Sequence, residues 1–151
     1  MSSGLGDARL SAPPDPADER VIRRTIVAAW AALDRKDWAV YAAAFADDGE
    51  LEIFGGRRRG RAEIAAGPLN DIARYEGLQH IISNELITVD GDEASGQWYA
   101  VAIHVPDSLR SAEHSDAGLR YTFRARRCAD GWKLAKLLVE VVWTSGVPLD
   151  I

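Results

Sequence analysis

The sequence feature that most constrains the fold is a change in hydrophobic period near Leu78. Before it, apolar residues such as Ile22, Ile26 and Trp30 recur at intervals of three and four, which predicts helices. After it, apolar and polar residues alternate, and Asp90-Gly91-Asp92 is typical of a hairpin turn between two strands. Helices followed by an antiparallel sheet predict an α+β fold.

The pattern predicts one domain with a helical first half and a strand-rich second half. The expected helices span residues 18–35, 38–45 and 61–75, and the expected strands span 50–54, 78–89, 93–105, 119–127 and 132–143. Residues 47–49 are expected to form a turn, and the glycine- and arginine-rich residues 55–60 a loop. Four long strands after three helices predict a strongly curved sheet wrapped around the first helix as a cone. The domain should cover residues 18–145, between a disordered arm (1–17) and a short tail (146–151).

Composition excludes several classes of function. The 151-residue chain has a net charge of −5, which argues against a nucleic-acid partner. Its one cysteine, Cys128, cannot form an internal disulfide and fits a reducing cytoplasm. No apolar run approaches the roughly 18 residues of a membrane span, and the first residues lack the pattern of a secretory signal. We therefore expect a cytoplasmic protein with no membrane contact.

His80 is the first candidate for chemistry, because it interrupts an apolar strand. It is either a core histidine that bonds a backbone carbonyl or a group that moves protons near neutral pH. Strand alternation places Asn84 on the same face. Two polar side chains on a buried face need each other, a ligand or water.

Asp34 is the second candidate. It lies in the last turn of the first expected helix, where the macrodipole disfavours a carboxylate, and it sits at the rim of the apolar face four residues after Trp30. Such a group needs either solvent or a cationic partner. Asp37, in contrast, is expected to cap the second helix.

The remaining polar groups give weaker indications. The run Arg57-Arg58-Arg59 with Arg61 is interpreted as a solvated loop, with anion binding as the alternative. His104 and His114 lack metal-ligand spacing, so no metal site is expected. Tyr121 and Phe123 share a strand face that should point inward, whereas alternation leaves open which face of 93–105 is internal.

Four stretches together resemble the SnoaL-like branch of the nuclear-transport-factor-2-like superfamily. They are IRRTIVAAWAALDRKDWAVYAAAFADDGELEIF, GRAEI, LQHIISNELITVDGDEASG and GWKLAKLLVEVVW, and the resemblance runs from Ala17 to Trp143. It implies a cone-shaped cavity enclosed by three helices and a curved antiparallel sheet, and pairing into homodimers through the outer sheet face. The superfamily contains both enzymes and non-catalytic binders.

Within that branch, scytalone dehydratase and the bile-acid dehydratases are the most similar in function. Their aspartate–histidine pair falls on Asp34 and His80 of this sequence. The resemblance implies that His80 is the general base that also returns a proton, and that Asp34 orients it and stabilises its charge. A third polar group of those enzymes falls close to Asp107.

One element of that pattern is missing near Asp34, because Trp30 and Leu33 stand where those enzymes have a tyrosine. Tyr41, Tyr99 or Tyr121 could supply the donor instead. We therefore predict a small-molecule lyase, isomerase or cyclase that uses no cofactor, in keeping with secondary metabolism. Its hydrophobic substrate is expected to contact Trp30, Tyr41, Phe54, Asn84, Tyr99, Asp107, Tyr121 and Phe123. The alternatives are a non-catalytic binding or dimerisation module and an accessory subunit of another enzyme.

Overall fold

The computed structural model describes residues 15–148, so most of the expected arm and the end of the tail lie outside the described residues. The helices are α1 (Pro16–Asp34), α2 (Trp38–Ala43), α3 (Gly60–Asp71) and the short 3-10 helix η1 (Ser108–Arg110). The strands are β1 (Phe45–Ile53), β2 (Gly56–Arg59), β3 (Gly77–Asp90), β4 (Glu93–Val105), β5 (Ser115–Cys128) and β6 (Gly131–Gly146). Asp15 caps α1 by accepting a hydrogen bond from the Ala17 amide, and Asp37 caps α2.

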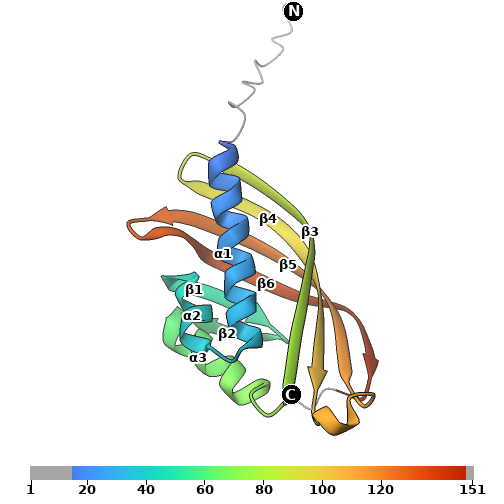
Figure 1. The fold of residues 1–151 in the computed structure, drawn as a ribbon. Coiled ribbons are helices and arrows are strands. Elements are labelled where there is room, and N and C mark those ends of the chain that lie inside the picture. The colour runs from blue at the N-terminus through green and yellow to red at the C-terminus, as the bar shows by residue number, and fades with distance from the viewer. Residues whose placement is uncertain (1–14, 149–151) are drawn as a thin grey trace, which may run out of the picture.

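The strands form one six-stranded sheet in the order β2-β1-β6-β5-β4-β3. The sheet curves around α1, and α2 and α3 lie beside the β1–β2 end (Figure 1). The α+β cone is therefore confirmed, although the sheet is mixed rather than purely antiparallel, because β1 runs parallel to β6. Within the described residues, no helix is long and apolar enough to cross a membrane.

Two expected irregular segments belong to the sheet. Residues 47–49, expected as a turn, lie within β1, where the register with β6 shifts between Phe45 and Glu50. The expected loop at 55–60 contains β2, because Phe54 and Gly55 adopt positive φ angles and turn the chain back onto β1. The turn makes β2 an edge strand of the sheet.

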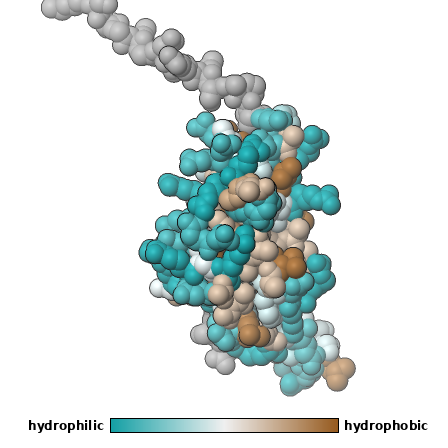
Figure 2. Space-filling view, turned by 90° about the vertical axis from the view of Figure 1, so that its left-hand side faces the viewer, coloured by the Kyte–Doolittle hydropathy of each residue, from teal (hydrophilic) through white to brown (hydrophobic). Residues whose placement is uncertain are grey.

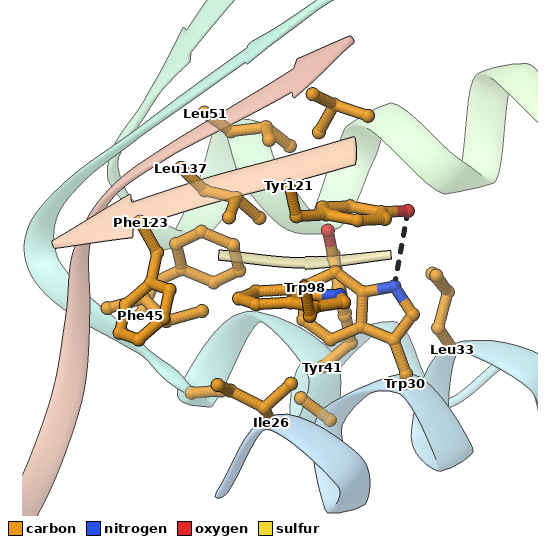
Figure 3. Close-up of a cluster of buried hydrophobic side chains, with 14 of the residues drawn as sticks. Ile26, Trp30, Leu33, Tyr41, Phe45, Leu51, Trp98, Tyr121, Phe123 and Leu137 are labelled. Atoms are coloured by element: carbon orange, nitrogen blue, oxygen red, sulfur yellow. Dashed lines mark hydrogen bonds between the residues drawn. The ribbon is translucent and has the colours of Figure 1, made fainter. Parts of the chain in front are cut away.

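The core sits between α1 and the concave face of the sheet. Trp30 lies edge-on to three aromatic rings, with centroid distances of 5.4 Å to Tyr41, 5.2 Å to Trp98 and 5.3 Å to Tyr121 (Figure 3). Edge-to-face packing of this kind adds stability beyond the area that it buries. Outside the core, hydrophilic residues cover most of the face that Figure 2 shows, and its strongly hydrophobic residues are scattered.

The structure settles which strand faces point inward. In β4, Trp98, Ala100 and Ala102 are buried, whereas Tyr99 is 38% exposed. In β3, a bulge between Ser83 and Leu86 shifts the alternation, and Asn84 is exposed with a φ of 57°. The expectation that Asn84 shares the face of His80 is therefore wrong, because an extra residue turns it outward.

Gly96 of β4 is expected to be intolerant of substitution, since it pairs with Ile87 just beyond the bulge and lies close to the β3 backbone. A Cβ atom there would lie 1.9 Å from the carbonyl oxygen of Leu86, which is backbone and cannot move aside easily. Gly96→Ala should lower the free energy of unfolding by about 1–3 kcal/mol in a denaturant titration. Gly56→Ala is the control, because its Cβ would meet only an ordinary contact at 3.5 Å. Equal losses in the two variants would contradict this account.

Candidate active site

Asp34 and His80 meet where the end of α1 packs against the start of β3. Asp34 Oδ1 lies 2.6 Å from His80 Nδ1, and Asp34 Oδ2 accepts a 2.9 Å hydrogen bond from the backbone amide of His80. The two donors compensate a carboxylate that the end of the helix dipole disfavours. The His80 side chain is only 5% exposed and that of Asp34 is 22% exposed, so the contact is shielded from bulk water.

This contact fixes the tautomer of the imidazole. An ionised carboxylate can only accept hydrogen bonds, so Nδ1 of His80 carries a proton and donates it to Asp34. In the neutral ring, Nε2 then holds a lone pair. Nε2 has no hydrogen-bond partner among residues 15–148, and His80 lines a cavity inside the cone. An oriented imidazole with a free lone pair is the arrangement that a general base requires.

The cavity is small and mostly apolar. It encloses about 70 Å³, roughly half of the 150 Å³ or so that holds benzene in an engineered apolar cavity. Its polar lining consists of Tyr41, Arg58, Asp71, His80, His104 and Tyr121. An apolar cavity with a few convergent polar groups is the usual form of a small-molecule site. A ring-sized ligand would require side chains to move, and the half-exposed Phe54 lies in the wall.

Two tyrosines supply hydroxyl groups to the cavity. Burial raises the pKa of Tyr121 and that of Tyr41, so both remain protonated donors. Tyr121 Oη accepts a 3.3 Å hydrogen bond from Trp30 Nε1, which leaves its proton free for another acceptor. Tyr121 is therefore a hydrogen-bond donor in the same cavity wall as His80.

His104 is a second imidazole in the cavity wall. Its ring centroid lies 6.2 Å from that of His80, and its Nδ1 donates a 3.2 Å hydrogen bond to the carbonyl oxygen of Ser115. Burial lowers its pKa, so the ring stays neutral with Nε2 as an acceptor. From the sequence, His104 was weighed only as a metal ligand. Its place on the same face as Trp98 is the signal that could have located it.

His104 gives a testable pH dependence. Its pKa in the folded protein lies below the ordinary 6.5, so below about pH 6.5 the unfolded chain binds the proton more readily and stability falls. The loss is at most about 1.4 kcal/mol per pH unit for one proton. His104→Asn keeps a donor for Ser115 but cannot titrate. The wild-type stability should therefore fall more steeply between pH 6.5 and 5 in denaturant titrations, and parallel curves would contradict the assignment.

The structure brings together only some of the predicted site residues. The cavity wall contains Trp30, Tyr41, Phe54, His80 and Tyr121, and Asp34 contacts His80. Asn84 and Tyr99 instead lie on the outer side of the sheet. Phe123 faces inward but packs in the core, 5.4 Å from Trp98, and does not line the cavity.

Asp107 also lies outside the cavity. It is partly exposed and caps η1, accepting a 2.9 Å hydrogen bond from the Leu109 amide and a 3.0 Å bond from Arg110. The expected third polar group is therefore not in the site, because the loop after β4 folds into its own short helix.

Arg58 and Asp71 are site residues that the sequence did not indicate. Arg58 belongs to the run interpreted as a solvated loop, but it lines the cavity and forms an ion pair with Asp71 at the end of α3. Recognising β2 as a strand would have found Arg58, because strand alternation turns it opposite to Arg57 and Arg59. Within the described part of the chain, no three His, Cys, Asp or Glu side chains are grouped to hold a metal ion.

The fold and the cavity define an α+β cone protein with a carboxylate–imidazole pair beside its cavity. The chain belongs to the SnoaL-like domain family, whose model matches residues 15–137. Comparison with curated protein sequences gives no match.

Several solved structures share the fold. A proposed aromatic ring hydroxylase from Novosphingobium aromaticivorans has a TM-score of 0.79 at 24% identity, covering 89% of this chain and 96% of that one. A proposed scytalone dehydratase from the same organism has a TM-score of 0.75 at 21% identity, covering 87% and 89%. A type 2 hexachlorocyclohexane dehydrochlorinase has a TM-score of 0.72 at 18% identity, covering 89% and 94%. At these identities the likeness establishes the fold alone.

Proposed function

We propose that this protein is an enzyme that uses acid–base catalysis without a cofactor to carry out an elimination, isomerisation or cyclisation on a small, largely apolar molecule. The observation that carries the proposal is the contact between Asp34 and His80, which leaves His80 Nε2 free at the cavity. Shielding from water strengthens the electrostatic coupling of such a pair.

In the proposed reaction, His80 Nε2 removes a proton from a carbon next to a carbonyl group. The electron pair of the C–H bond moves toward the carbonyl oxygen, and Tyr121 stabilises the resulting charge by donating a hydrogen bond. Asp34 stabilises the imidazolium that forms. His80 then returns the proton, either to a departing hydroxyl group, which completes an elimination, or to another carbon, which completes an isomerisation.

His104 has a supporting role in this proposal. As a neutral ring whose Nδ1 bonds Ser115, it offers Nε2 as an acceptor for a hydroxyl group of the substrate. It adds no second positive charge beside the imidazolium of His80. In this proposal, His80 moves the proton and His104 orients the substrate.

Two of the structural neighbours have names that denote eliminations, a dehydratase and a dehydrochlorinase. An elimination of either kind requires a base that removes a proton. The names support elimination as the first reaction to examine. Homodimer formation through the outer sheet face stays a prediction.

The experiment that tests the proposal detects proton abstraction itself. The protein is incubated in D₂O with small enolisable ketones such as cyclohexanone, and loss of the α-proton signals is followed by NMR. We expect deuterium incorporation above the buffer rate, and we expect it to require His80. If every ketone that NMR titration shows to bind exchanges its α-protons no faster than in buffer, the proposal that this protein is an enzyme is rejected.

The second candidate is a non-catalytic ligand-binding module. The observation that favours it is the cavity volume of about 70 Å³, which is small for an enzyme acting on a ring compound. In that case His80→Gln would change ligand affinity or stability, and no proton exchange would be found in either protein.

A further inference from the structure

The three consecutive arginines of β2 do not point the same way. Arg57 forms a 2.9 Å ion pair with Glu52, and Arg59 forms a 2.8 Å ion pair with Glu50, both on the exposed face. Arg58 points to the other side and lines the cavity, with its side chain 23% exposed. It is the cationic side chain that the described residues contribute to the cavity wall.

The position of the Arg58 guanidinium depends on two residues of α3. Asp71 holds it through an ion pair, and Gly67 leaves it room. A Cβ atom at Gly67 would lie 2.0 Å from Arg58 Nη1 and 2.3 Å from its Cζ. The guanidinium is therefore seated against the helix backbone, close enough for its charge to act on the Tyr41 hydroxyl.

Arg58 and His80 come from opposite edges of the sheet. β2 and β3 are the two edge strands, yet both residues line the same cavity. The cavity wall thus contains His80, which Asp34 holds from behind, and Arg58, together with apolar side chains such as Leu51 and Leu119. A ligand that fills the cavity can be held at two points.

The charges favour a neutral ligand group at Arg58. Asp71 already compensates its positive charge, and Asp34, bound to His80, adds a second carboxylate near the cavity. A ligand carboxylate would be the third negative charge, after those of Asp71 and Asp34, against the single positive charge of Arg58. A guanidinium has five N–H donors, so Arg58 can still donate to an uncharged oxygen while it is bound to Asp71.

We propose that Arg58 is a specificity-determining residue that binds a neutral hydroxyl or carbonyl oxygen at the end of the substrate remote from the carbon facing His80. The inference rests on the proposed function for the reacting end of the substrate. It defines the substrate class as small, uncharged molecules with an apolar body and oxygen atoms at both ends.

Binding of three matched ketones tests this inference. Cyclohexanone, 4-hydroxycyclohexanone and 4-oxocyclohexanecarboxylate differ only at the carbon opposite the carbonyl, and NMR titration of backbone amides gives a Kd for each. The wild-type protein should bind the hydroxyl compound most tightly. Arg58→Gln should weaken that binding by about tenfold and leave cyclohexanone unchanged. Arg57→Gln, the outward-facing control in the same strand, should change neither.

Asp71→Asn separates recognition from a structural role. If the ion pair only joins β2 to α3, Arg58→Gln and Asp71→Asn should have the same effects. If Arg58 binds the substrate, Asp71→Asn should instead improve binding of the carboxylate compound by about tenfold, because it leaves the guanidinium charge uncompensated. His80→Gln should keep the preference for the hydroxyl compound, so this inference can hold even where proton exchange fails. An unchanged preference in Arg58→Gln overturns it, as does a wild-type protein that binds no ketone or prefers the carboxylate.

Discussion

Glutamine in place of His80 is expected to lower the rate of deuterium incorporation by about 10²- to 10⁴-fold, the usual contribution of a general base. Glutamine can still donate to Asp34, so it preserves the contact that joins α1 to β3. It has no basic nitrogen, however, and cannot accept the substrate proton. The measurement is the exchange rate of a bound ketone, compared at saturating concentration.

His114→Gln is the matched control, because His114 pairs with Asp116 outside the cavity. It should leave the exchange rate within about twofold of the wild type. Thermal unfolding of both variants checks that each is folded. A folded His80→Gln protein that exchanges as fast as the wild type would show that His80 is not the base.

Asparagine in place of Asp34 should lower the exchange rate nearly as much as His80→Gln does, although it replaces only one carboxylate oxygen with an NH₂ group. Both carboxylate oxygens accept hydrogen bonds from His80, one from the ring and one from the backbone amide. Asparagine has a single acceptor oxygen, so its NH₂ group must face one of these donors. If it faces the ring, it reverses the tautomer, and the lone pair needed for catalysis turns away from the cavity. We expect the exchange rate to fall by about 10²-fold or more.

Asp37→Asn provides the control for this variant. Asp37 lies three residues away and caps α2 by accepting a hydrogen bond from the Val40 amide. Asparagine caps helices about as well as aspartate, so stability and exchange should both be retained. Equal exchange rates for Asp34→Asn and Asp37→Asn would mean that Asp34 does not orient the base.

The sequence predicted the elements whose hydrophobic period is long and regular. The limits of β4 and the α2 cap agree with expectation, because a hairpin turn precedes β4, a proline follows it, and a single aspartate precedes α2. Asp34 and His80 are 46 residues apart, so no local pattern could join them. Their pairing came from the family resemblance, together with the poor electrostatic place of Asp34.

Other features depended on backbone geometry that the residue pattern does not encode. The bulge in β3 turned Asn84 outward, since one extra residue exchanges the two faces of a strand. Positive φ angles at Phe54 and Gly55 created β2 and placed Arg58 in the cavity, where a loop had been expected. Because Trp98 packs against Trp30, its face of β4 points inward, and His104 on the same face lines the cavity.

Whether His80 can act as a base is decided by which of its two ring nitrogens carries the proton, and ¹⁵N NMR of the neutral imidazole measures this. We expect Nδ1 to carry the proton, held by Asp34, and Nε2 to show the shift of a bare nitrogen facing the cavity. A neutral ring protonated at Nε2 would contradict this expectation, because His80 would then have no lone pair to offer a substrate.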